Sequence, residues 1–192
     1  MAHALKNNET VNRVELSDNS ITDITSFLEI ISGNRVIEHM NLSKNRIGMN
    51  GCKALGSFLN ETTCQLKNLD LSKNKLTDRD VGTLLGALHE NQSLQKLNLS
   101  RNLLTKKSVN SLCEFLMQNS SVTELDLSWN TLKAQGVERI MATLRNDATL
   151  KKLKLSWNGI ADEGAALISE TLSDLHVEEL DLVGNGITDT GS

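Results

Sequence analysis

The sequence LQKLNLSRNLL, from Leu94 to Leu104, decides how this chain folds, because the same eleven-residue phrase recurs along the whole chain. Its skeleton is LxxLxLxxNxL, and it occurs seven times. The asparagines of the seven copies are Asn19, Asn45, Asn74, Asn102, Asn130, Asn158 and Asn185. Successive asparagines are 26, 29, 28, 28, 28 and 27 residues apart. A fixed period of this size predicts a stacked repeat architecture.

Each part of the phrase has a physical reason. Leu97 and Leu99 alternate with polar residues, which is the period of a β-strand with one buried face. Asn102 follows this strand, where the backbone must turn. An Asn side chain can there hydrogen-bond backbone groups that no neighbouring strand serves. We therefore expect the asparagines to form a buried ladder along the stack.

The segments between the phrases have the periodicity of helices. Val137, Ile140, Met141 and Leu144, for example, are spaced by three and four residues, which places them on one helical face. The segments expected to be helical are 22–34, 50–60, 78–90, 106–118, 134–145 and 162–173.

With these features the chain resembles a leucine-rich repeat protein, specifically the ribonuclease-inhibitor-like subclass with repeats of about 28 residues. The resemblance covers essentially the whole chain. It implies an α/β leucine-rich-repeat solenoid, or horseshoe, with parallel β-strands on the concave face and α-helices on the convex face. We expect a single domain over residues 1–192 in which both terminal repeats are incomplete, as in a piece of a longer solenoid.

The composition argues against several classes of protein. The net charge of −4 and a pI near 5.6 disfavour nucleic-acid binding. No apolar run approaches the roughly 18 residues that would span a membrane. The cysteines, Cys52, Cys64 and Cys113, form no CxxC pair and no cysteine-rich cap, so we expect a reducing, cytoplasmic location. By its place in the repeat Cys52 is a buried helix residue, whereas Cys64 is expected to be exposed in a loop.

The sequence also lacks the patterns of an enzyme. Its four histidines have no metal-ligand spacing to another His or Cys, and there is no Gly-rich phosphate loop, GxSxG or HExxH. We therefore predict that the protein is not an enzyme and has no cofactor, no metal site and no small-molecule substrate.

The outward-facing strand positions form rows, because adjacent strands lie about 4.8 Å apart. The row just before the asparagine holds Asp18, Lys44, Lys73, Arg101, Trp129, Trp157 and Gly184. Trp129 and Trp157 are the only tryptophans, and they replace positions that are Lys or Arg in earlier repeats, so we expect both indoles to face solvent. Exposed aromatic residues concentrate at protein interfaces. The alternative is that the indoles pack on each other and merely stiffen the stack.

Charged residues surround the tryptophans in the neighbouring rows. Asp126 and Asp181 flank Lys154, and Glu124 and Glu179 flank Lys152. We expect these charges to compensate one another across the strands. The basic run Lys44, Lys73 and Arg101 is less fully compensated, and we expect Asp70 to offset part of it. Such a run would either steer an acidic partner or form a solvated face. The predicted partner-binding residues are Trp129, Trp157, Asp126, Lys154, Lys152, Arg101 and Asp181.

The sequence therefore favours a protein–protein interaction module that presents the concave face of a rigid solenoid to a protein partner. The resemblance leaves other functions open. One is a GTPase-activating or other regulatory protein that acts on a bound partner. Others are a segment of a cytoskeletal or axonemal scaffold, with its contacts on the helical face, and a segment of a cytosolic immune receptor.

Overall fold

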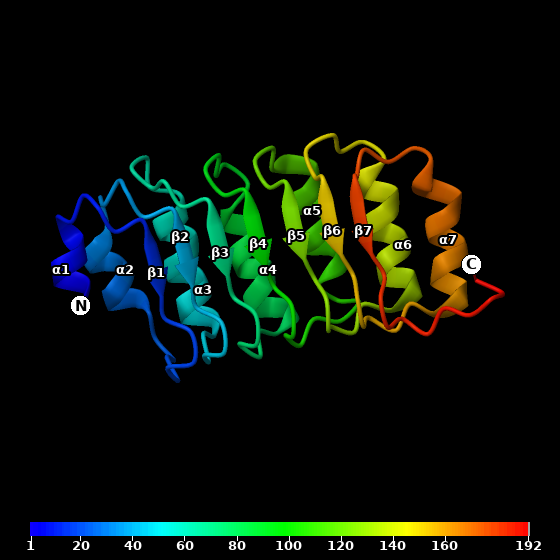
Figure 1. The fold of residues 1–192 in the computed structure, drawn as a ribbon, viewed down its shortest axis with the longest axis horizontal. Helices are drawn as coiled ribbons and strands as arrows, with labels where there is room; N and C mark the ends of the chain where they lie inside the picture. The colour runs from blue at the N-terminus through cyan, green and yellow to red at the C-terminus, as the bar shows by residue number, and fades with distance from the viewer. Residues whose placement is uncertain (192) are drawn as a thin grey trace.

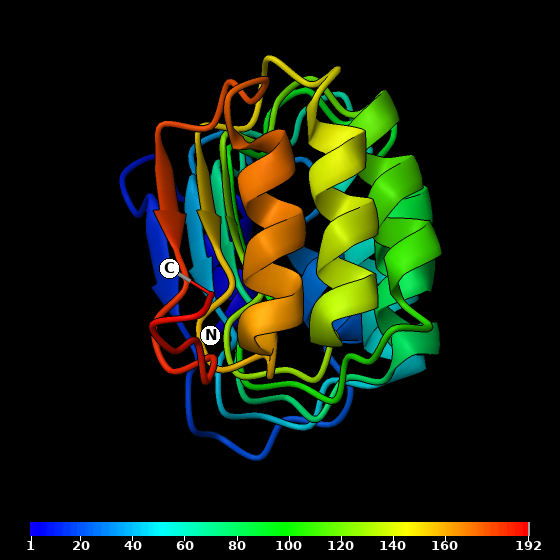
Figure 2. The same ribbon diagram turned by 90° about the vertical axis from the view of Figure 1, so that its right-hand side faces the viewer.

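A computed structural model describes residues 1–191, which form two layers. One layer is a sheet of seven parallel strands in chain order, and the other is a row of helices covering one face of it (Figure 1). The view along the stack separates the two layers (Figure 2). The strands are β1 Arg13–Glu15, β2 His39–Asn41, β3 Asn68–Asp70, β4 Lys96–Asn98, β5 Glu124–Asp126, β6 Lys152–Lys154 and β7 Glu179–Asp181. The helices are α1 Ala2–Lys6, α2 Thr25–Ile31, α3 Met49–Leu59, α4 Asp78–Ala87, α5 Val109–Gln118, α6 Lys133–Leu144 and α7 Ala161–Leu172.

The leucine-rich-repeat solenoid expected from the phrase is confirmed. The strands pair so that equivalent residues lie side by side, as Leu69, Leu97 and Leu125 do in β3 to β5. These leucines are buried between the sheet and the helices, where the predicted apolar face of each helix meets them. On α6, for example, Val137 and Ile140 are fully buried. One continuous apolar strip therefore runs along the stack.

Two expected helices begin three residues later than the sequence predicted. The segment 22–34 becomes helical at Thr25, the first residue of α2. The segment 106–118 becomes helical only at Val109, the first residue of α5. The preceding Thr105 donates its backbone N–H to Oδ1 of Asp78 at 2.7 Å, and it forms a bridge with Thr131. These contacts tie the chain to both neighbouring repeats, so the segment reaches the helix through a turn.

The asparagine of each inner phrase forms the predicted buried ladder. Nδ2 of Asn102 donates to the carbonyls of Leu99, at 2.9 Å, and Leu71, at 3.1 Å. Its Oδ1 accepts the N–H groups of Asn74 and Leu76, both at 3.0 Å. One amide thus satisfies two buried donors and two buried acceptors from two repeats. The exposed fractions of Asn45, Asn74, Asn102, Asn130, Asn158 and Asn185 are all below 9%.

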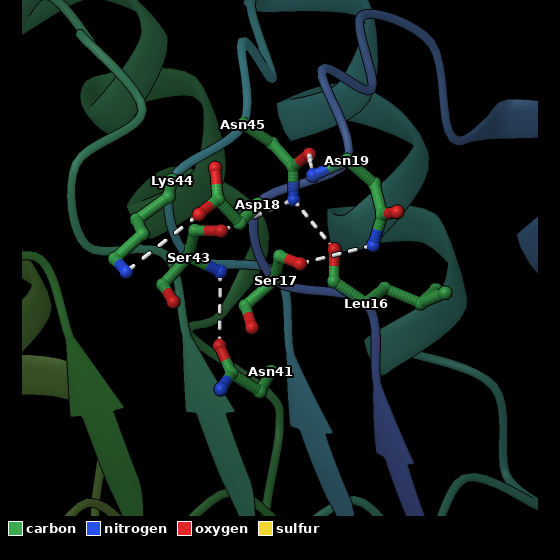
Figure 3. Close-up of polar contacts among 8 residues, drawn as sticks. All are labelled: Leu16, Ser17, Asp18, Asn19, Asn41, Ser43, Lys44 and Asn45. Carbon is green, nitrogen blue, oxygen red and sulfur yellow. Dashed lines mark hydrogen bonds and ion pairs between the residues drawn. The ribbon is translucent and has the colours of Figure 1, made fainter.

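Figure 3 shows the first rung of this ladder, between the first two repeats. Asn45 accepts the N–H of Asn19 and donates to the carbonyl of Leu16, at 3.0 and 2.8 Å. The exposed Asn19 begins the row and donates instead to the carbonyl of Ser17. The ladder therefore holds each repeat to the one before it.

A second polar row, which the sequence analysis missed, fixes the opposite edge of the sheet. Asn119 donates to the carbonyls of Leu88 and Asn91 and accepts the N–H of Val122, at 2.9, 3.0 and 2.9 Å. Equivalent side chains, three residues before the first apolar residue of a phrase, are Asn8, Asn34, Asn91 and Asp147. The recurring Asn or Asp at this position was the signal in the sequence.

The prediction that Cys64 is exposed was wrong, because its side chain packs into the apolar core and is 6% exposed. In this repeat Thr63 replaces the asparagine of the second row. The distance between the ladder asparagines Asn45 and Asn74 is 29 residues, one more than in the three steps that follow. Burial raises the pKa of the Cys64 thiol, and it raises that of the buried Cys52 to about 12. All three cysteines are free.

Within residues 1–191, no helix is both long enough and apolar enough to cross a membrane.

We expect Asn102→Ala to lower the free energy of unfolding by about 2–4 kcal/mol, because it leaves buried backbone groups of two repeats without a hydrogen-bond partner. Asn19→Ala, at the exposed start of the row, is the control and should cost below about 1 kcal/mol. Urea unfolding followed by circular dichroism measures both. Equal losses for the two variants would contradict the role given to the ladder.

Candidate protein-binding site

The row that contains the tryptophans lies in the turns that follow the strands, along the lower edge of the sheet in Figure 1. Its residues have left-handed backbone conformations, with φ of 55° at Arg101, 57° at Trp129 and 55° at Trp157. Each backbone N–H donates to the next repeat, as Trp129 does to the carbonyl of Ser156 at 2.7 Å. The backbone positions of the row are therefore in register, and neighbouring side chains of the row start about one strand spacing apart.

That spacing brings the two indoles into direct contact. The ring centroids of Trp129 and Trp157 are 4.5 Å apart, with 16° between the ring planes. The guanidinium of Arg101 lies over the other side of Trp129, 4.1 Å from the ring centroid. A side chain at Gly184 would overlap the indole of Trp157, so that ring lies against the Gly184 backbone. We call these four residues the indole stack.

Both indoles are about half-exposed, although each ring has close neighbours within the indole stack. Trp129 is 41% exposed and Trp157 is 48% exposed, which confirms that both indoles face solvent. The neighbours are Arg101, the opposite indole and the Gly184 backbone. The indoles therefore pack on each other, as the alternative interpretation of the sequence expected, and are also exposed to solvent. A partner can approach the exposed parts of the rings without disturbing the stack.

A second feature, the strand-face groove, lies on the face of the sheet away from the helices. It has a volume of about 270 Å³ and is lined by outward-facing side chains of β1 to β6. Three of the predicted partner-binding residues line it, namely Asp126, Lys152 and Lys154. The indole stack and Asp181 lie outside its lining. The structure thus divides the predicted residues between the groove and the neighbouring edge.

The groove is lined by paired charges, in part as predicted. Nζ of Lys152 lies 3.0 Å from a carboxylate oxygen of Glu179, and this hydrogen bond raises the pKa of Lys152. Glu124 pairs instead with Lys96, at 2.7 Å. Lys154 lies between two aspartates in the register, yet forms no ion pair within residues 1–191. The charge of Lys154 nevertheless contributes to the lowered pKa of Asp181, so Lys154 acts on that carboxylate without a direct ion pair.

The aspartates have a structural role that the sequence analysis missed. Asp126 accepts the N–H of Ser128 at 2.9 Å, and Asp181 accepts that of Val183 at 3.0 Å. The hydroxyl of Ser156, followed by this backbone N–H, lowers the pKa of Asp181. Asn41, Asp70 and Asn98 cap the same turn in their own repeats. The sequence signal for this role was an Asn or Asp two residues before the serine of the phrase, as Asp126 is before Ser128.

Asp70, expected to offset part of the basic run, forms no ion pair with it within residues 1–191. Its carboxylate accepts from Ser72 N–H at 2.8 Å and from Nδ2 of Asn98 at 3.2 Å. Lys44 pairs with Asp18 instead, at 3.8 Å (Figure 3). The two oxygens of the Asp70 carboxylate therefore accept hydrogen bonds from its own turn and from the next repeat.

Val183 is an apolar residue of this edge that the sequence analysis left out of the site. It replaces the serine of the other repeats, and its side chain is 66% exposed. Its carbonyl accepts the N–H of Trp157 at 2.9 Å, so it lies beside the indole stack. Within residues 1–191, no cluster of His, Cys, Asp and Glu has the size to hold a metal ion.

Comparison with protein families identifies the repeats of the chain. A family model described as Leucine Rich repeat matches residues 33–56, 64–85, 118–141, 146–169 and 173–191, and a second, described as Leucine Rich Repeat, matches residues 93–115. The chain belongs to the leucine-rich repeat family. These matches support a protein-binding repeat module, while the ribonuclease-inhibitor-like subclass stays a prediction.

Solved structures share the fold at low sequence identity. The leiomodin-1 actin-binding site 2 is 18% identical, with a TM-score of 0.58, over 90% of this chain and 86% of that one. The tropomodulin C-terminal domain of Caenorhabditis elegans is 16% identical, with a TM-score of 0.53, over 90% and 89%. TLR13, in its complex with ssRNA13, is 23% identical, with a TM-score of 0.58, over 95% of this chain and 23% of that one. These similarities concern the fold alone.

We expect Gly184→Ala to displace Trp157, because the new methyl group would overlap the indole. Gly186→Ala is the matched control, since Gly186 has the same φ of 70° and open space around it. Both variants carry the left-handed strain of about 1–2 kcal/mol, and Gly184→Ala loses about 1–3 kcal/mol more. Tryptophan emission should change in Gly184→Ala only. Unchanged emission in both variants would contradict this packing.

We expect Lys154→Asn to stabilise the protein by about 0.5–1 kcal/mol, because it supplies the missing cap to the N–H of Ser156. Lys154→Gln removes the same charge, but its longer side chain does not match the cap, so its stability should stay near that of the parent. Thermal melting distinguishes the two. Equal stabilisation by both variants would mean that charge, rather than the cap, is responsible.

Proposed function

We propose that this protein is a protein–protein interaction module that binds its partner at the indole stack and the adjoining strand-face groove. The observation that carries the proposal is the pair of half-exposed indoles held at 4.5 Å on the edge of the sheet. Exposed tryptophan and arginine side chains are the residue types that dominate binding energy at protein interfaces. Trp129, Trp157 and Arg101 would be the anchors.

The rigidity of the site supports this proposal. The left-handed turns and the asparagine ladder hold the anchors in place before a partner arrives. Stacking restricts the indole side chains, so less conformational entropy is lost on binding. Lys154, which is exposed and unpaired within residues 1–191, would add a charge contact from the groove. Asp126, Asp181 and Lys152 would position these contacts through their own bonds.

We infer that the protein acts by binding and has no active site of its own. A GTPase-activating role, a scaffold role and a place in an immune receptor remain compatible with a binding module, and each implies a different partner. The leiomodin-1 structure is an actin-binding site, which makes actin the first purified protein to test. A scaffold that used the helical face would not depend on the tryptophans.

The test is affinity capture from eukaryotic cell lysate with the parent chain and with Trp129→Ala/Trp157→Ala. We expect the double variant to lose the partner, since each anchor contributes about 2 kcal/mol or more. Mass spectrometry identifies the captured protein, and co-sedimentation tests actin directly.

Met117→Ala/Leu172→Ala is the matched control, because it removes two exposed apolar side chains from helices α5 and α7. Thermal melting checks that both double variants stay folded. Equal capture by parent and tryptophan variant would contradict the proposed site, and loss only in the helix variant would move the contact to the helical face.

A further inference from the structure

The edge of the sheet that carries the indole stack is basic over the preceding repeats. In each phrase, the residues just before and just after the ladder asparagine point to solvent. In the second and third repeats all four of these positions are cations, namely Lys44, Arg46, Lys73 and Lys75. We call these four residues the basic rim. Figure 3 shows Lys44 extending away from the backbone at this edge.

The cations of the basic rim are largely uncompensated. Lys44 lies 3.8 Å from Asp18, and no other rim residue has an ion-pair partner within residues 1–191. On the adjoining strand face, by contrast, Lys96 and Lys152 are paired at 2.7 and 3.0 Å. The chain as a whole has a net charge of −4. An uncompensated basic strip on an acidic protein is therefore a local property of this edge.

The basic rim continues into the indole stack. Backbone N–H groups of the row link Lys73 to Ser100, at 3.0 Å, and Arg101 to Ser128, at 2.8 Å. Arg101 thus follows Lys73 by one strand spacing and reaches the first indole. From Lys44 to Trp157 the row changes from cationic to aromatic, and the exposed Val183 precedes its last residue, Gly184.

We propose that the partner contributes an acidic protein segment with an apolar end, whose carboxylates lie on the basic rim and whose apolar side chains lie on the exposed indoles and Val183. This inference rests on the proposed function and specifies the chemistry of the partner. Complementary charge steers the encounter and fixes the orientation of the segment, while the indoles supply the contact area.

The same charges would attract a single-stranded nucleic acid, but the indole stack does not suit one. Proteins that bind such strands combine a basic groove along the phosphates with aromatic ring faces on which the bases stack. Here the two indoles already stack on each other, Arg101 lies over Trp129 and Gly184 lies against Trp157, so a base would compete with these contacts. The exposed parts of the rings suit aliphatic and carbonyl groups of a protein. The observations therefore favour an acidic protein segment over nucleic acid.

The chain carries its own reporter for the test, because its only tryptophans are in the indole stack and it has no tyrosine. The probe is a short glutamate-rich peptide that ends in leucines and lacks tryptophan and tyrosine. Matched peptides replace every glutamate by glutamine or by lysine. Titration at low salt is followed by tryptophan emission, with oligothymidylate as a separate probe. We expect the acidic peptide to bind about tenfold more tightly than the glutamine peptide, and this preference to disappear at high salt.

The deciding variant is Arg46→Gln/Lys73→Gln/Lys75→Gln, which should bring the affinity of the acidic peptide down to that of the glutamine peptide. The matched control is Lys6→Gln/Lys53→Gln/Arg139→Gln. It removes the same charges from exposed positions on helices α1, α3 and α6, and it should keep the preference for the acidic peptide.

Three results would overturn the inference: no acidic preference, an equal loss in both triple variants, or tighter binding of oligothymidylate that depends on the rim. Absence of any acidic-peptide binding at low salt also counts against it. If the glutamine peptide binds as well as the acidic one and Trp129→Ala/Trp157→Ala abolishes both, the proposed function stands and only the acidic partner fails. Partner capture that survives the tryptophan variant contradicts the proposed function itself.

Discussion

The buried asparagine ladder is the interaction on which the rest of this structure depends. Every repeat must turn after its strand, and each turn leaves backbone groups without strand partners. The amide of Asn102 serves four of them, in two adjacent repeats. Only a side chain with both donors and acceptors does this, so the ladder fixes the register of each repeat against the next. The leucines fill the core that this register creates.

The same register determines what the surface can do. Residues beside the ladder have left-handed backbones held in line, and equivalent side chains repeat at about the strand spacing of 4.8 Å. That distance is close to the stacking distance of aromatic rings. Two tryptophans in consecutive repeats therefore stack without any adjustment of the fold. The chemistry of the edge changes from repeat to repeat, while its geometry stays constant.

The strand face and the adjoining edge of the sheet differ in how far their charges are paired. On the strand face, oppositely charged neighbours such as Lys152 and Glu179 meet directly across parallel strands. On the edge, the aspartates that precede the turns are engaged with backbone N–H groups, as Asp70 is with Ser72. Within residues 1–191, Lys44 is the only cation of the basic rim with an ion-pair partner, so a basic strip lies exposed beside the indoles.

The sequence by itself determined the solenoid, its strand and helix order, the buried ladder and the exposure of Trp129 and Trp157, because these follow from a period repeated seven times. It did not reveal the burial of Cys64, the capping role of Asp126 or the separation of the indoles from the groove. These features depend on side-chain contacts in three dimensions, where several possible partners lie within reach of the same side chain. A periodic sequence specifies which residues become neighbours, and only the tertiary structure decides which of those neighbours bond.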